Sequence, residues 1–129
     1  MTPAAIKTPR FRAVVENTFA ADAARDAARF VTRLSEDATF QLGGQPPVHG
    51  RAAIEAMIAA TFCAFAAVEH ELVRAMEADE QDLLIYEAIV HYTFADGRVA
   101  AVPYVNVLDF ADDLVRRYRI YLDLSVLAP

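Results

Sequence analysis

The first half of the chain carries apolar residues at the three- and four-residue spacing that is typical of amphipathic helices. This spacing predicts one helix around residues 11–19 and another over residues 51–65. Between them, Asp22 is a suitable N-cap for a further helix whose apolar side falls within residues 27–34. Residues 37–42 alternate in polarity, which predicts a short strand, and a loop rich in glycine and proline follows. The first half is therefore expected to be mostly helical.

The second half of the chain contains four long runs that read as β-strands. They cover residues 67–78, 83–94, 99–110 and 114–124. Short polar breaks separate them, and Asp96-Gly97 favours a tight hairpin because glycine adopts a positive φ at no steric cost. Three successive hairpins predict an antiparallel meander. We therefore expect an α+β fold, in which three N-terminal helices pack on one face of a strongly curved, mostly antiparallel sheet.

Composition narrows the class of protein. The chain has 129 residues, of which 56% are hydrophobic and 23% are charged, and this indicates one folded domain rather than a disordered segment. A net charge of −6 argues against a nucleic-acid partner, because binding a phosphate backbone needs a basic face. Cys63 is the single cysteine, so neither an intramolecular disulfide framework nor a cysteine zinc cluster can form.

Nothing in the sequence directs the chain to a membrane or out of the cell. The longest apolar run, residues 56–68, is interrupted by a threonine and is too short to span a bilayer. Residues 1–10 lack the apolar stretch of a signal peptide, so a cytoplasmic protein is expected. There is no glycine-rich phosphate loop, and His49, His70 and His91 lack the spacing of metal ligands, so neither a cofactor nor a metal is expected.

Several short motifs make the sequence similar to a known family. They are Asp37-Ala-Thr-Phe, Gly-Gln-Pro-Pro-Val-His-Gly-Arg at residues 44–51 followed by Ile54, Asp96-Gly97, Val102-Pro103 and the closing Tyr121-x-Asp123. With these motifs the chain resembles the ketosteroid isomerase and SnoaL-like group of the nuclear transport factor 2 superfamily. The resemblance implies a single domain over residues 1–129, folded as a cone-shaped roll with a deep pocket open at one end. It leaves the chemistry open, because the superfamily includes isomerases, dehydratases, epoxide hydrolases, cyclases and non-enzymes.

The resemblance also locates the positions that carry the isomerase chemistry. The base aspartate, the oxyanion-hole tyrosine, its two supporting tyrosines and the oxyanion-hole aspartic acid correspond, in this order, to Leu42, Thr18, Leu34, Ile58 and Asn106. A general base must be ionisable, and leucine is not, so ketosteroid isomerase activity is not expected. The aspartate of the related epoxide hydrolases corresponds to Ile120, which argues against that chemistry as well.

Strand alternation extends this correspondence to the side chains that would line the cone. If Asn106 faces inward as its counterpart does, so does Tyr104. The same carry-over places Glu87 and His91 inward on the preceding strand, and Tyr118 inward on the last. On the first long strand, His70 faces inward if Val68, Leu72 and Met76 do.

A wall of this composition suits a small, largely apolar molecule with one or two polar handles. We hypothesise that His91 is the general acid or base and that Glu87 is its counterpart, while Asn106 with Tyr104 polarises a carbonyl. The residues expected to bind the ligand are His70, Tyr104, Asn106, Tyr118, Thr18, Leu42, Ile58 and Leu122.

Structural interpretations of the same residues stand beside this hypothesis. Glu87 could face a dimer partner or pair with Arg117 or Arg119. His91 could be a hydrogen-bonded core histidine, and His70, between two glutamates, could lie on the surface.

Two classes of function follow. One is a cofactor-free acid–base enzyme acting on a small hydrophobic molecule, as an isomerase, lyase, cyclase or hydrolase. The other is a non-catalytic ligand-binding or dimeric structural module. A homodimer through the sheet is expected in either case, because an apolar outer face usually marks an interface. The residues predicted to form that face are Val73, Ala88, Val90, Val105 and Val107.

Overall fold

The computed structural model describes residues 1–127 of the chain. Its helices are α1 (Pro9–Ala24), α2 (Ala27–Phe30) and α3 (Arg51–Cys63), with short 3₁₀ turns η1 (Pro3–Ala5), η2 (Val31–Arg33), η3 (Asp79–Gln81) and η4 (Leu124–Leu127). Its strands are β1 (Leu34–Leu42), β2 (Val48–His49), β3 (Ala67–Ala78), β4 (Leu83–Thr93), β5 (Val99–Ala111) and β6 (Leu114–Leu122). Among these residues, no helix has the length and apolarity that crossing a membrane requires.

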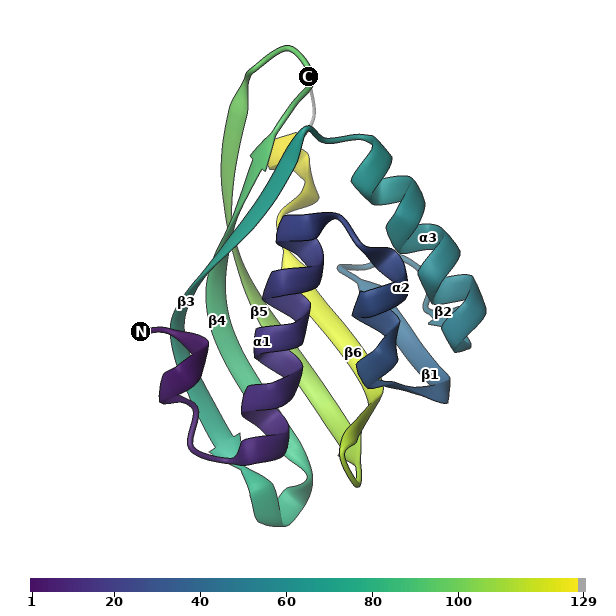
Figure 1. The fold of residues 1–129 in the computed structure, drawn as a ribbon, viewed down its shortest axis with the longest axis vertical. Helices are drawn as coiled ribbons and strands as arrows, with labels where there is room; N and C mark the ends of the chain where they lie inside the picture. The colour runs from purple at the N-terminus through teal and green to yellow at the C-terminus, as the bar shows by residue number, and fades with distance from the viewer. Residues whose placement is uncertain (128–129) are drawn as a thin grey trace.

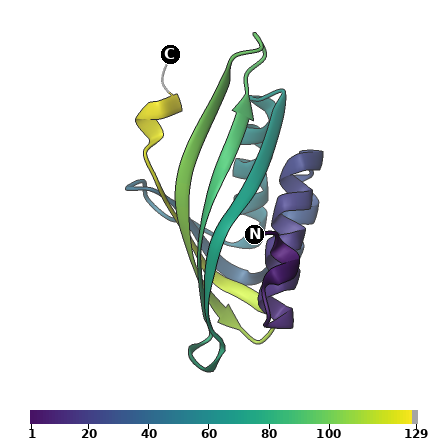
Figure 2. The ribbon, with the colours of Figure 1, turned by 90° about the vertical axis from the view of Figure 1, so that its left-hand side faces the viewer.

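The six strands form one mixed sheet in the order β2-β1-β6-β5-β4-β3. Strands β3 to β6 are successive antiparallel neighbours, as the hairpin signals predict, and β1 joins β6 in parallel. Helices α1 and α3 lie on the same side of the long, curved strands (Figures 1 and 2). Three helices packed on an open, strongly curved sheet confirm the expected α+β fold.

Side chains fill the space between the N-terminal end of α1 and the last residues of β5. Phe11 of α1 and Phe110 of β5 are buried there, with ring centroids 4.7 Å apart. The guanidinium of Arg10 lies over both rings and forms ion pairs with Asp79 and Asp82. Because this end is closed, the space left for a ligand lies further along the sheet, near the C-terminal end of α1.

The boundary between the first two helices differs from the sequence-based expectation. Asp22 lies inside the last turns of α1 and is buried, so its expected role as an N-cap is wrong. Helix α1 ends at Arg25, which adopts a left-handed conformation with φ 51°. Asp26 is the N-cap of α2, since its carboxylate accepts a hydrogen bond from the backbone N–H of Arg29 at 3.0 Å. Helix α1 therefore continues through Asp22 to Ala24, although the polarity of Asp22 suggested that the helix ends before it.

The pairing of β4 with β5 shows which of their side chains face the helices. On β5 the buried, inward positions include Tyr104 and Asn106, as expected. Asn106 pairs directly with Tyr86 of β4, and Val105 pairs with Glu87. Residues directly opposite each other in an antiparallel pair share one face of the sheet. The inward position on β4 is therefore Tyr86, and the expected inward facing of Glu87 is wrong by one residue.

Strand β3 changes facing partway along its length. The pairing of β3 with β4 shifts register between Leu72 and Arg74, which marks a β-bulge. Before the bulge, His70 and Leu72 face the helices; beyond it, Met76 is 64% exposed. His70 therefore faces inward as expected, whereas the same expectation for Met76 is wrong.

The outer face of the sheet is less apolar than expected. Ala88 and Val90 are buried on the inner side, because they share the parity of Tyr86. Val73 is exposed and Val105 is half-buried. The predicted outer patch is thus wrong for two of its five residues.

Candidate functional site

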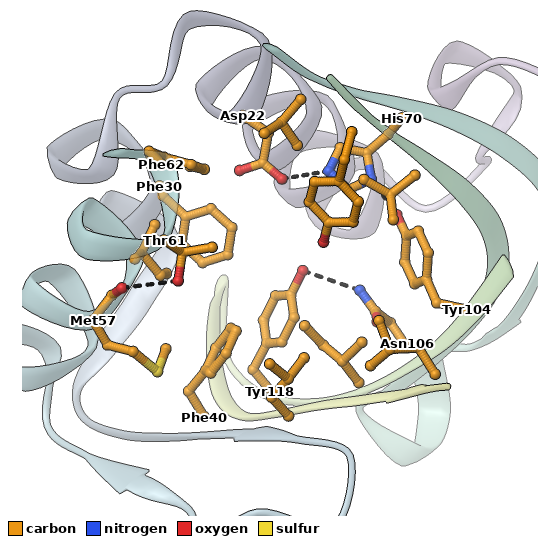
Figure 3. A pocket seen from close by; sticks show the side chains of 17 residues that line it. Asp22, Phe30, Phe40, Met57, Thr61, Phe62, His70, Tyr104, Asn106 and Tyr118 are labelled. Carbon is orange, nitrogen blue, oxygen red and sulfur yellow. Dashed lines mark hydrogen bonds and ion pairs between the residues drawn. The ribbon is translucent and has the colours of Figure 1, made fainter. Parts of the chain in front are cut away.

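A pocket lies between the helices and the inner face of the sheet. Its lining residues are Asp22, Phe30, Phe40, Leu42, Met57, Ile58, Thr61, Phe62, Val68, His70, Val90, Tyr92, Tyr104, Asn106, Tyr118, Ile120 and Leu122. The cavity measures about 100 Å³ for a water-sized sphere, whereas a single water needs roughly 10–15 Å³ on this scale. The space therefore fits a small organic molecule, and its walls are mostly aliphatic and aromatic (Figure 3).

A chain of three hydrogen-bonded side chains crosses one side of the pocket. Asp22 of α1 pairs with His70 of β3 through Oδ2 and Nε2. The other imidazole nitrogen, Nδ1, lies 2.7 Å from the hydroxyl of Tyr104 on β5. The side chains of His70 and Asp22 are only 9% and 11% exposed, and the ring of Phe19 stacks on the imidazole with centroids 5.0 Å apart. Three separate elements thus hold one buried acid–base group.

Taking Asp22 as a carboxylate and His70 as a neutral imidazole fixes the hydrogens in this chain. The carboxylate only accepts, so the hydrogen of the Asp22–His70 pair sits on Nε2. Nδ1 is then an acceptor, and the Tyr104 hydroxyl donates to it. Burial raises the pKa of Tyr104 well above its ordinary value, so this hydroxyl keeps its hydrogen at neutral pH.

A second polar cluster lies beside the first. Nδ2 of Asn106 donates to the hydroxyl oxygens of Tyr86 and Tyr118, at 2.7 and 3.0 Å. The two hydroxyl oxygens are 3.4 Å apart. Burial raises the pKa of Tyr86 to about 12 and also raises the pKa of Tyr118, so both remain neutral phenols.

Two buried oxygen atoms at these clusters have no hydrogen-bond partner within residues 1–127. They are Oδ1 of Asp22 and Oδ1 of Asn106, both on side chains that line the pocket. Buried polar atoms in folded proteins are almost always hydrogen-bonded. An unpartnered carboxylate oxygen inside an apolar pocket is therefore a candidate for contact with a bound molecule.

Most of the residues expected to bind a ligand line this pocket. They are His70, Tyr104, Asn106, Tyr118, Leu42, Ile58 and Leu122. Thr18 is buried on α1 but is not among the lining residues.

The two residues expected to be catalytic lie on the other face of the sheet. Glu87 forms an ion pair with Arg74 at 2.8 Å, and His91 lies 3.4 Å from Glu71. Neither lines the pocket. The expectation that Glu87 and His91 share the pocket is wrong, because the register of β4 against β5 points them to the outer face. The arginine that pairs with Glu87 is also not Arg117 or Arg119, the two that the sequence suggested.

Asp22 is the ionisable pocket residue that the sequence did not predict. Its position continues the buried face of α1, since it follows Thr18 by four residues and Val15 by seven. That spacing favours an inward-facing side chain, whereas the polarity of aspartate favours a helix cap. Within the described residues, no group of three or more His, Cys, Asp or Glu side chains is placed to hold a metal ion.

Solved structures with the same fold support the architecture. A hypothetical protein from Catenulispora acidiphila with a ketosteroid isomerase-like fold, in complex with trimethylamine, is 21% identical with a TM-score of 0.79, covering 88% of this chain and 87% of that chain. A putative SnoaL-like polyketide cyclase from Jannaschia sp. CCS1 is 18% identical with a TM-score of 0.79, covering 96% and 98%. An LEH-like epoxide hydrolase from M. tuberculosis is 14% identical with a TM-score of 0.74, covering 88% and 82%.

Comparison with protein families identifies the sequence group. No curated protein matches the chain. The family model of the SnoaL-like domain matches residues 15–118, a range that runs from α1 to β6 and includes Asp22, His70 and Asn106. The chain therefore belongs to the SnoaL-like domain family.

Proposed function

We propose that the pocket binds a small, mostly apolar molecule and that Asp22 transfers a proton to or from it without a cofactor. The observation that carries this proposal is the free Oδ1 of Asp22, a buried carboxylate oxygen with no partner within residues 1–127. A positioned carboxylate within reach of a substrate is a common general base.

His70 acts through Asp22 rather than on the substrate. Both of its ring nitrogens are occupied, one by Asp22 and the other by the Tyr104 hydroxyl. The hydrogen bond from Nε2 holds the Oδ2 side of the carboxylate and leaves Oδ1 without a partner within residues 1–127. Figure 3 shows the carboxylate of Asp22 at the pocket wall. His70 is thus a positioning residue, and Tyr104 orients His70 instead of polarising a carbonyl.

The names of the similar structures favour this class of chemistry, although they differ in the reaction. The similar structures include a putative polyketide cyclase and an LEH-like epoxide hydrolase, and one similar protein holds trimethylamine. Cyclisation, isomerisation, elimination and hydrolysis of small molecules all need a proton to move at one carbon or oxygen atom. A buried carboxylate in an apolar pocket supplies that step in each of them.

Opening of 5-nitrobenzisoxazole tests the proposal. This small, flat compound loses one C–H proton to a base; the electron pair forms a nitrile, the N–O bond breaks, and a coloured phenolate leaves. We expect the wild-type protein to accelerate the opening and the Asp22→Asn variant to be slower by about 100-fold. His70→Gln should show a smaller loss, because the base remains but is less well held.

The outer face supplies matched controls. His91→Gln and Glu87→Gln change a histidine and a carboxylate outside the pocket and should leave the opening rate unchanged. Equal rates for wild type and Asp22→Asn would contradict the proposal. Saturable binding of the compound, measured by calorimetry, without any opening would favour the alternative of a non-catalytic small-ligand-binding module.

The homodimer is a separate proposal. Val73 and Tyr121 are exposed on the outer face, and Val105 and Val107 are half-buried beside them. A second copy of the chain covering this face would remove that apolar area from water. Light scattering at micromolar concentration should give twice the mass of the chain, and Val105→Glu should lower it; a monomeric wild-type protein would contradict the proposal.

A further inference from the structure

One tyrosine of the pocket keeps its hydroxyl free. Tyr104 and Tyr118 line the cavity, and the hydroxyl of each is hydrogen-bonded to other side chains. Tyr92 of β4 lines the same cavity, but none of the side-chain hydrogen bonds within residues 1–127 involves its hydroxyl. The oxygen is not fully buried, so a molecule in the pocket can reach it. A hydrogen-bond donor is therefore left open at a mostly apolar wall.

Sheet pairing places Tyr92 beside the Asp22–His70 pair. Tyr92 is directly opposite Val68 in the β3–β4 pair, and His70 is opposite Val90. Tyr92 and His70 are therefore diagonal neighbours on the inner face, a separation of about 7–8 Å that an aromatic side chain can bridge. Burial, and next the nearby Asp22 carboxylate, raise the pKa of Tyr92 to about 12. The hydroxyl thus keeps its hydrogen at neutral pH.

Packing holds the ring of Tyr92 without using its hydroxyl. Phe65, in the link between α3 and β3, packs on this ring with centroids 4.4 Å apart, and Phe94 packs on Phe65 at 5.3 Å. Arg25 fixes the same link, because its Nη1 donates to the backbone oxygen of Phe65 at 2.9 Å. A donor that is held in place before a ligand arrives needs no rearrangement when charge develops beside it.

Tyr92 and Asp22 are complementary, yet they do not satisfy each other. Oδ1 of Asp22 is a buried acceptor without a partner within residues 1–127, and the Tyr92 hydroxyl is a donor that no other described residue engages. Both side chains line one cavity. Because polar groups removed from water are almost always hydrogen-bonded, two opposite groups left open at one cavity indicate that a bound molecule satisfies both.

We propose that Tyr92 is a second catalytic residue, which donates a hydrogen bond to the substrate oxygen that becomes negative as Asp22 removes a proton. The C–H proton passes to Asp22, the C–H electron pair forms a new π bond, and the electrons of the bond that breaks stay on the oxygen. A phenol placed at that oxygen stabilises the transition state more than the neutral substrate. The inference rests on Asp22 being the base, as the proposed function holds, and it adds the group that stabilises the charge.

Two substrates that differ in the departing oxygen test this role. 5-Chlorobenzisoxazole opens by the same proton removal as 5-nitrobenzisoxazole, but it releases a more basic phenolate whose charge is more concentrated on the oxygen. A donor to that oxygen therefore matters more for the chloro compound. We expect Tyr92→Phe to lower kcat about tenfold for the chloro compound and about threefold for the nitro compound, with little change in KM.

Matched tyrosine variants separate this role from a structural one. Tyr92→Phe keeps the ring and deletes a hydroxyl that has no partner within residues 1–127, so it should not lower the midpoint of thermal unfolding. Tyr104→Phe deletes a bonded hydroxyl, so it should lower the midpoint and slow both substrates by the same factor, since it acts through the position of Asp22. Tyr121→Phe, on the exposed face, should change neither quantity.

Binding gives a readout that does not depend on proton removal. Acetophenone carries an accepting oxygen, and ethylbenzene has a similar size without one. The ratio of their affinities, measured by calorimetry, should fall about fivefold in Tyr92→Phe, because the variant loses one hydrogen bond to the ketone and none to the hydrocarbon. The same ratio should stay unchanged in Tyr121→Phe.

Three results would overturn the inference: equal slowing of the two benzisoxazoles by Tyr92→Phe, an affinity ratio that this variant does not change, or no binding of acetophenone to the wild-type protein. Failure here is distinct from failure of the proposed function. If Asp22→Asn stops the opening while Tyr92→Phe alters neither rate, the base stands and the donor falls. If the wild-type protein opens neither compound but the affinity ratio falls as expected, proton transfer by Asp22 falls and Tyr92 stands as the donor to a bound oxygen.

Discussion

Two histidine–carboxylate pairs lie on opposite faces of the same sheet. His70 pairs with Asp22 on the inner face, where the two side chains are 9% and 11% exposed. His91 pairs with Glu71 on the outer face, where they are 43% and 63% exposed. His70 and Glu71 are consecutive residues of β3, so strand alternation alone sends one to the pocket and the other to the surface.

Both pairs join an imidazole to a carboxylate, so the difference expected between them comes from their surroundings. On the outer face, water competes for both partners, and salt screens their attraction. On the inner face, each polar atom must find a partner in the protein or in a ligand. The inner pair also has a third member, Tyr104, which holds the imidazole from the other side.

The largest expected difference is in stability after loss of the histidine. His70→Leu leaves the buried carboxylate of Asp22 without its partner, and should lower the free energy of unfolding by about 3 kcal/mol. His91→Leu removes an exposed partner and should change it by less than about 0.5 kcal/mol. Urea unfolding of the two variants checks the comparison, and equal losses would break it.

A double-mutant cycle should sharpen the same contrast. Asp22→Leu/His70→Leu removes both buried polar groups, so it should regain part of the stability that either single change loses, with a coupling of about 2 kcal/mol. The corresponding cycle for Glu71 and His91 should give about 0–0.5 kcal/mol. An inner coupling as small as the outer one would show that the buried pair is not held together.

Removal of single hydroxyl groups should have a smaller effect. Tyr104→Phe deletes the donor to Nδ1 of His70 and should cost about 1 kcal/mol of stability. It should also slow the opening of 5-nitrobenzisoxazole with little change in binding, because it loosens the group that positions Asp22. Tyr121→Phe on the exposed face is the control and should change neither quantity.

The smallest expected effect concerns the outer ion pair of Arg74 and Glu87. Glu87→Gln should cost no more than about 0.5 kcal/mol, and raising sodium chloride to 1 M should abolish that cost. The Asp22–His70 coupling, away from solvent, should persist at the same salt concentration. A salt-sensitive inner coupling would mean that water enters the pair.

The sequence predicted the elements more accurately than the site. Strand β3 has the predicted bounds, and the other long strands end within one or two residues of theirs. Turn signals such as Asp96-Gly97 act locally, over a few residues, which is why they could be interpreted without the fold. The start of α2 was less accurate, since two aspartates, Asp22 and Asp26, both lie where a cap could stand.

The candidate site could be predicted only in part. His70, Tyr104, Asn106 and Tyr118 all line the pocket. The inward facing of Asn106 and Tyr118 was expected from the family correspondence, and that of Tyr104 from strand alternation. Glu87 and His91 were not, since parity within a strand does not reveal how that strand is aligned with its neighbour.

The sequence alone determined most of the secondary structure, the order of the long strands and the apolar character of the pocket, because periodicity and turn chemistry are properties of neighbouring residues. Only the tertiary structure decided which acid–base group enters the pocket. The register of β4 against β5 turned Glu87 outward, and the extra turn of α1 brought Asp22 to His70. A shift of one residue in pairing exchanges the two faces of a strand, so the choice between a buried and a solvated pair depends on contacts between distant segments.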